Sequence, residues 1–261
     1  MKTFKAWLEL GRVSNLPTVW SNAIHGLAVG IFVAAILPIE RDFGYTLAFG
    51  WPQFGRVLNQ GFVLLVGLSL LYVGGMFLND ACDARIDADE RPNRPIPSGR
   101  ISRPHAFFAA AALLAVGWAC TLVYVPMVQI SAAALVAAIV AYNLLHHIRG
   151  LGLVFMPICR GLVVWIAASA IVIGAGIDDD LPRIFGSVLA VACYTLIITL
   201  IAWGEALPSL GRWSRGVGIM IALMPLIDIV FVLQFEMWPM IFFCLACAVI
   251  SLAAQRFIPG S

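Results

Sequence analysis

The sequence predicts an all-α protein, a polytopic bundle of transmembrane helices that forms one domain over residues 1–261. Of the 261 residues, 62% are hydrophobic and only 11% are charged, whereas soluble domains average about 45–50% apolar and about 25% charged residues. The mean hydropathy is +0.96. One soluble core cannot bury so much apolar surface, so we expect most of it to face membrane lipid. The net charge of +2 gives no basis for nucleic-acid binding.

Hydropathy predicts eight membrane spans, and the chain length leaves room for nine, because a helix crosses the hydrocarbon core in about 20 residues. The first span follows the polar residues 1–15, and the second ends where a strongly charged segment begins. Pro126 separates the third span from the fourth, and a short interruption at 234–238 separates the last two. We interpret residues 39–56, which are polar and aromatic, as a loop or an interfacial segment. The predicted spans are residues 16–38, 57–78, 104–124, 126–146, 152–176, 183–205, 214–234 and 237–256.

The distribution of lysine and arginine predicts which ends of the spans are cytoplasmic. The loops on the side of the N-terminus carry twelve of these 16 residues, the opposite loops carry three, and Arg160 lies within a span. Because cytoplasmic loops are enriched in Lys and Arg, we expect the N-terminus and the loop between spans two and three to be cytoplasmic. The chain is therefore predicted to be a multi-pass membrane protein, in the cell membrane if its source is bacterial.

The loop between spans two and three holds the densest charge in the chain, with ten of the 30 charged residues between positions 80 and 103. If the second helix continues into it, Asp80, Asp83 and Asp87 lie within about 60° of one another on one face. Like charges at this spacing repel one another, so a cation must compensate them. Mg²⁺ suits the arrangement because it takes carboxylate oxygens and keeps water and substrate phosphate oxygens in its shell.

The segment that follows the acids, residues 91–100, contains three prolines, which stiffen it, and the arginines Arg91 and Arg94. Arginine is permanently charged and donates to phosphate through a bidentate fork. Acids for a metal and arginines for phosphate together indicate a diphosphate site. The alternative is an ordinary solvated loop in which Arg85, Arg91 and Arg94 neutralise the acids.

The run from residue 79 to residue 102 resembles the first aspartate motif and the following loop of the UbiA superfamily of intramembrane prenyltransferases. Residues 11–22 are similar to the start of these enzymes, in which an asparagine of the first helix faces the cavity, and Asn22 takes that place. Met156 and Arg160 resemble a Met-x-x-x-Arg element of the fifth helix in this family. The resemblance spans most of the chain, but only the segment 79–102 is diagnostic.

This resemblance implies a bundle, usually of nine helices, around a central cavity that opens to the membrane. It also implies a Mg²⁺-dependent prenyltransferase that moves an isoprenyl group from an allylic isoprenyl diphosphate donor to an aromatic or other lipophilic acceptor. Asn79, Asp80, Asp83 and Asp87 take the catalytic positions, and the three aspartates are the expected ligands of Mg²⁺. The residues expected to contact substrate are Asn22, Arg94, Tyr142, His146, Arg160 and Glu205.

The sequence departs from the family pattern in two places. Members carry a second aspartate motif, whereas the corresponding region, 202–213, has Glu205 as its only acid. The Tyr-x-x-x-Lys element of the family is also altered, because Tyr142 is followed by His146, a titratable group. For His146, a polar cap at a helix end remains an equal alternative. The altered second motif and the start of the chain resemble those of the EboC branch of the superfamily.

Arg160 is a functional candidate independently of the resemblance, because a charge inside a span costs at least about 2.5–3.5 kcal/mol and usually faces a polar interior. His25, one helical turn from Asn22, is a weaker cavity candidate. Cys244 and Cys247 form a CxxC pair without a second pair, so we interpret them as small core residues.

Two other classes of protein have features in common with this sequence. A prenyl-lipid binding or transport protein with a degenerate site is the alternative that the altered second motif favours. CDP-alcohol phosphotransferases also place aspartates at a helix end, but their pattern requires a glycine after the first aspartate, and Asp80 is followed by Ala81.

Overall fold

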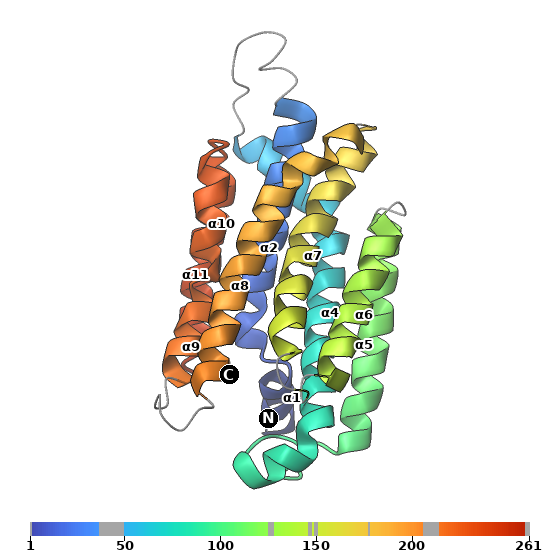
Figure 1. Cartoon of the computed structure of the whole chain (residues 1–261), viewed down its shortest axis with the longest axis vertical. Helices are drawn as coiled ribbons and strands as arrows, with labels where there is room; N and C mark the ends of the chain where they lie inside the picture. Colours follow the sequence, from blue (N-terminus) through green and yellow to red (C-terminus); the bar gives the residue numbers. More distant parts are fainter. Residues whose placement is uncertain are drawn as a thin grey trace.

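The computed structural model describes residues 2–36, 50–124, 128–145, 148, 151–176, 178–205 and 214–258. Within these residues the regular structure is entirely helical, and the long helices run along the length of an elongated bundle (Figure 1). The predicted all-α bundle is therefore confirmed. The long helices are α2 (Leu16–Ile31), α4 (Trp51–Glu90), α5 (Arg103–Tyr124), α6 (Gln129–Leu145), α7 (Gly152–Gly174), α8 (Phe185–Glu205), α10 (Met224–Leu233) and α11 (Trp238–Ala254). The shorter ones are α1 (Lys2–Leu10), the 3₁₀ turn η1 (Val13–Asn15), the π-helical turn η2 (Phe32–Ile36), the 3₁₀ turn η4 (Asp178–Ile184) and α9 (Ser214–Ala222).

Each of the eight predicted spans corresponds to apolar helix in the described part of the chain. Six stretches are long and apolar enough to cross a membrane, and α6 and α11 are shorter apolar helices. The seventh predicted span is divided at Leu223 into α9 and α10. Pro225 explains the division, because proline lacks the N–H that would bond to the preceding turn.

The predicted end of the second span is wrong, because α4 runs from Trp51 to Glu90 rather than over 57–78. The acidic residues are therefore part of the helix instead of a loop. Residues 51–56, at the end of the segment interpreted as a loop or an interfacial segment, are helical, which excludes a simple loop there, and 39–49 lie outside the described residues.

The outer faces of the helices carry large apolar side chains. Phe108 is 78% exposed and Ile130 is 80% exposed. Large apolar patches are unfavourable in water, so these faces fit a lipid environment.

Small residues allow two helix pairs to approach closely. Between α4 and α5, a Cβ on Gly67 would lie 3.0 Å from the carbonyl oxygen of Gly117. Between α2 and α7, a Cβ on Gly26 would lie 2.5 Å from the carbonyl oxygen of Val164, and one on Gly30 would lie 2.7 Å from that of Ala168. Close backbone approach at small residues is typical of helix pairs in membranes. The contact at Gly26 brings the polar residues of α2 beside Arg160, one turn before Val164.

The N-terminal helix and the segment that joins α4 to α5 lie at the same end of the bundle (Figure 1). Arg100 of this segment donates to Glu9 of α1 at 2.6 Å. Leu10, Phe77 and Ile96 belong to one apolar cluster that joins α1, α4 and the segment after α4. The N-terminus and the charged segment are thus on one side, and the assignment of that side to the cytoplasm stays a prediction.

Candidate active site

The last turns of α4 present their acids to the interior of the protein. Asp80 and Asp87 are 4% and 3% exposed, and Asp83 is half-buried. Arg85 and Ile86, between them in sequence, are exposed. The three carboxylates therefore share the inward face, as their helical spacing requires.

Two arginines neutralise the buried acids. The Nη1 atom of Arg94 lies 2.6 Å from Oδ2 of Asp87 and 3.6 Å from Oδ1 of Asp80. The Nη2 atom of Arg12 lies 3.2 Å from the same oxygen of Asp80. Arg91 is a weaker partner, because it is 3.9 Å from Asp87 and its side chain is 58% exposed. Burial lowers the pKa of Arg12, but the charge interactions with Asp80, Tyr72 and Tyr142 and the hydrogen bond to Asp80 together outweigh it, so the pKa is raised above its usual value.

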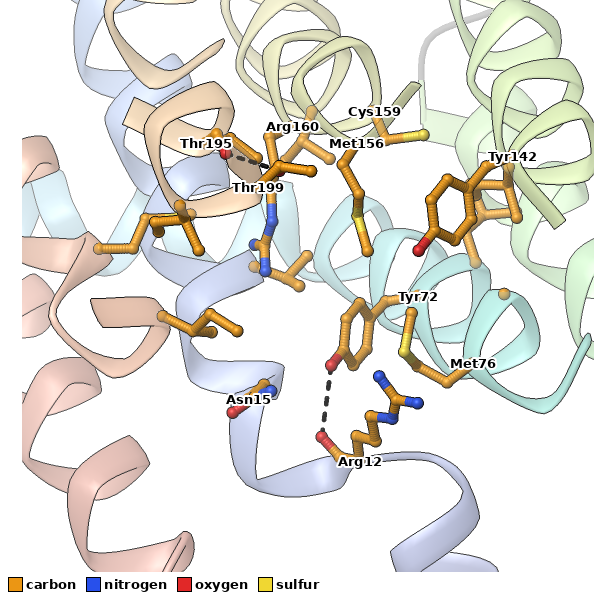
Figure 2. A pocket seen from close by; sticks show the side chains of 18 of the residues that line it. Arg12, Asn15, Tyr72, Met76, Tyr142, Met156, Cys159, Arg160, Thr195 and Thr199 are labelled. Atoms are coloured by element: carbon orange, nitrogen blue, oxygen red, sulfur yellow. Dashed lines mark hydrogen bonds between the residues drawn. The ribbon is translucent and has the colours of Figure 1, made fainter. Parts of the chain in front are cut away.

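Arg12 is held in an uncommon backbone conformation between α1 and η1. Its φ and ψ are 44° and 46°, in the left-handed region that costs a non-glycine residue free energy. The hydroxyl of Tyr72 donates to its carbonyl oxygen at 3.4 Å, as Figure 2 shows. This conformation turns the side chain toward α4, and sequence reasoning did not find its contact with Asp80.

The oxygen donors at the end of α4 suit a hard divalent cation. Asp80 and Asp83 offer carboxylate oxygens, and the side-chain amide of Asn79, which donates to Asp83 at 3.0 Å, has its own oxygen available as a neutral ligand. Among the described residues, no three His, Cys, Asp or Glu side chains converge closely enough to hold a metal ion. The oxygen donors of α4 are therefore of the kind that Mg²⁺ takes, but the carboxylates of Asp80 and Asp87 are paired with arginines and do not converge with Asp83 on one point.

A cavity of about 240 Å³ lies next to this charged cluster, and Arg12 lines it. Most of its wall is apolar, with Leu68, Ile139 and Val163 among the lining residues. Figure 2 shows Tyr72, Tyr142, Met156 and Arg160 around this space. An apolar cavity lined by Arg12 and Arg160 can hold an amphiphile with an anionic head and an apolar tail.

Arg160 of α7 is one of the polar groups in the cavity wall. Its Nη1 donates to Oδ1 of Asn22 at 3.0 Å, and its Nη2 donates to Oγ1 of Thr18 at 2.9 Å. The guanidinium carbon lies 5.9 Å from the centre of the Tyr72 ring. The structure therefore places this intramembrane charge at the cavity.

Behind Arg160, a buried carboxylate that sequence reasoning missed joins α10 to α2. Asp228 accepts hydrogen bonds from Ser21 and from Nδ2 of Asn22, the latter at 3.0 and 3.1 Å. Nδ1 of His25 lies 2.8 Å from the same carboxylate. All four side chains are fully buried. The signal that could have found Asp228 is the one that marked Arg160, a charged residue within a predicted span.

The remaining candidates have different positions. Tyr142 lines the cavity, whereas Asn22 lies behind Arg160 and His25 belongs to the buried cluster of Asp228. Glu205 is the last residue of α8, and its side chain is not described. His146 lies outside the described residues. Two further residues, Cys244 and Cys247, are buried in α11.

The fold and the site define an integral membrane protein, a helical bundle in which an apolar cavity adjoins an acidic helix end with bound arginines. The family model of the UbiA prenyltransferase family matches residues 43–259, most of the chain. The chain belongs to this family.

Relatives with assigned names are similar over part of the chain. Digeranylgeranylglyceryl phosphate synthase from Sulfolobus acidocaldarius is 32% identical over 154 residues, which cover 58% of this chain and 46% of the relative. Protoheme IX farnesyltransferase 2 from Pseudoalteromonas translucida is 33% identical over 95 residues, which cover 35% of this chain and 30% of the relative. The chain thus matches less than half the length of these curated relatives. A solved structure described as that of digeranylgeranylglyceryl phosphate synthase has a TM-score of 0.56 at 16% identity, over 99% of this chain and 96% of that chain, and shows a shared fold.

Proposed function

We propose that the protein is a Mg²⁺-dependent membrane prenyltransferase that moves an isoprenyl group from an allylic diphosphate to an aromatic or other lipophilic acceptor. The observation that carries this proposal is the apolar cavity that meets the aspartates of α4 through Arg12. The names of the two relatives, a digeranylgeranylglyceryl phosphate synthase and a protoheme farnesyltransferase, support prenyl transfer as the reaction class. They have different acceptors, so they leave the acceptor of this chain open.

The acids at the end of α4 would hold the cation. Asp80, Asp83 and Asp87 would supply carboxylate oxygens, and Asn79 would orient Asp83 through their hydrogen bond. When bound, Mg²⁺ would stabilise the negative charge that develops on the diphosphate as the C–O bond breaks.

The arginines beside these acids would bind the diphosphate itself. Arg94 and Arg12 now neutralise Asp80 and Asp87. Once the carboxylates bind a cation, the N–H groups of both guanidinium groups are released and can donate to phosphate oxygens. Donors already in place where the charge develops need little rearrangement during the reaction.

The rest of the cavity would protect the reactive carbon. Leu68, Ile139 and Val163 form a wall without polar side-chain atoms, which keeps water from the electron-deficient isoprenyl group. Tyr142 and Arg160, in the same cavity, would contact the acceptor or the phosphate groups. We propose His146 and Glu205 as further contacts, and the cytoplasmic side as the side from which the diphosphate enters.

A second candidate function is binding or transport of prenyl lipids without turnover. The region 202–213 offers Glu205 as its only acid where the family has a second aspartate motif. A single acidic cluster supplies fewer ligands for metal ions than two facing clusters do, and this would weaken diphosphate chemistry.

Purified full-length protein in lipid nanodiscs distinguishes the two functions. Labelled geranylgeranyl diphosphate is supplied with a panel of acceptors, which includes glyceryl phosphates and aromatic ring precursors, with Mg²⁺ or with EDTA. We expect transfer with Mg²⁺ only, and a fall of about 10²-fold or more in Asp80→Asn and Asp83→Asn. Asp89→Asn, at an exposed position of the same helix, is the matched control and should retain activity. Saturable binding of the diphosphate without product from any acceptor would favour the transport function.

A further inference from the structure

Within the described part of the chain, the charge of Arg160 is not balanced by direct contact with an acid. Among the described residues its hydrogen-bond acceptors are Asn22 and Thr18, which are neutral side chains. The carboxylate that belongs to the same network is Asp228, on the other side of Asn22. The amide side chain of Asn22 therefore lies between a half-buried cation, Arg160, and a buried anion, Asp228.

The orientation of this amide is fixed from both sides. Its oxygen accepts from Arg160, and its nitrogen donates to both carboxylate oxygens of Asp228. Ser21 also donates to Asp228, and Nδ1 of His25 contacts it at 2.8 Å. The carboxylate of Asp228 is thus contacted by polar side chains from three positions of α2.

The spacing has a physical consequence for Arg160. A direct ion pair with an acid would occupy the guanidinium donors and neutralise their field, as Arg94 and Asp87 do at 2.6 Å. With Asn22 interposed, the carboxylate still lowers the free energy of burying the cation, but it takes none of the five N–H groups. Two of these groups are used by Asn22 and Thr18. Arg160 thus remains available to an anionic group in the cavity that it lines.

We propose that Asp228 is a positioning residue that acts through Asn22 to balance the charge of Arg160 and hold its guanidinium at the cavity wall, where it binds a phosphate group. Asp228 is not among the residues that line the cavity, so it would act on a bound phosphate only through Asn22 and Arg160. The inference rests on the proposed function, since the phosphate is that of the diphosphate donor or of a phosphorylated acceptor.

Relocation of the carboxylate tests this proposal. Asp228→Asn should lower the thermal midpoint and raise the KM for the phosphate-bearing substrate about tenfold, with a smaller change in kcat. Adding Asn22→Asp to this variant moves the carboxylate into direct contact with Arg160. The thermal midpoint should then recover while the KM stays high, because the new carboxylate at position 22 pairs directly with the N–H groups of Arg160. If Asp228 only holds α2 to α10, the midpoint and the KM will recover together or neither will, and either result overturns the proposal.

A binding measurement keeps this test separate from the proposed activity. The shift in thermal midpoint is recorded with inorganic diphosphate and, separately, with glycerol 3-phosphate, which represent donor and acceptor phosphates. We expect at least one of them to shift the wild-type midpoint and to lose most of that effect in Asp228→Asn. Equal shifts in wild type and Asp228→Asn, or no shift in either, would overturn the inference even if prenyl transfer is observed. If the wild type transfers no prenyl group but Asp228→Asn still loses the phosphate-induced shift, only the proposed function would be contradicted.

Two further variants serve as a substitute for Asp228→Asn and as a control. If Asp228→Asn does not fold, Asn22→Ala removes the relay while Ser21 and His25 continue to satisfy the carboxylate, and it should lose the same phosphate-induced shift. Ser251→Ala is the matched control, because Ser251 is fully buried and its hydroxyl has no hydrogen-bond partner among the described residues. It should keep the wild-type response to phosphate, and a similar loss in this variant would contradict the assignment to Asp228.

Discussion

The close contact between α2 and α7 gives a prediction whose size follows from the structure. In Gly26→Ala the new Cβ would lie 2.5 Å from the carbonyl oxygen of Val164, and the helices must separate by about 0.9 Å to reach ordinary contact at 3.4 Å. Asn22 and Arg160 lie one turn before these residues on their own helices. If the same displacement acts on their 3.0 Å hydrogen bond, it lengthens to about 3.9 Å and is lost. We expect overpacking to destabilise the protein by about 1–3 kcal/mol.

Thermal unfolding in detergent, combined with the transfer assay, measures both effects. The destabilisation corresponds to a fall of about 2–12 °C in the unfolding midpoint. The KM for the phosphate-bearing substrate should rise, because Arg160 loses its contact with α2. Gly186→Ala is the matched control, since Gly186 lies in α8 and no heavy atom is within 4 Å of its added Cβ. A Gly26→Ala protein with the wild-type midpoint and KM would refute the idea that this contact holds Arg160 in place.

Two more substitutions probe the charged cluster and the altered second motif. Arg94→Gln should lower the free energy of unfolding by about 3–5 kcal/mol and abolish transfer, because it leaves the buried carboxylate of Asp87 without its 2.6 Å partner. Arg91→Gln, which removes an exposed partner 3.9 Å from Asp87, should lower it by less than about 1 kcal/mol. Similar unfolding midpoints for the two variants would contradict the assignment of Arg94 as the main partner of Asp87. Glu205→Gln should impair turnover with labelled prenyl diphosphate if Glu205 does the work of the second motif, and unchanged kcat and KM would identify this region as a simple loop.

The sequence predicted those features that depend on short stretches of chain. Apolar stretches of about 20 residues have few alternatives to helix in lipid, because every backbone polar group must be satisfied within the segment. Helical geometry likewise places Asp80, Asp83 and Asp87 on one face, whatever packs against that face. The end of α4 was missed because the hydropathy of a segment falls at its first charges, whereas the helix continues to Glu90.

The sequence by itself therefore determined the membrane bundle and the acidic face of α4, and it identified Arg160 as a functional candidate. Tertiary structure decided which groups meet. Arg12 reaches Asp80 across 68 residues of sequence, and Asn22 reaches Asp228 across 206. The periodicity of a single helix cannot predict such contacts, because they depend on which helices pack together and how closely their backbones approach. At Gly26 that approach is set by the absence of a side chain, and it brings Arg160 of α7 to one side of Asn22, whereas the packing of α10 brings the buried Asp228 to the other side.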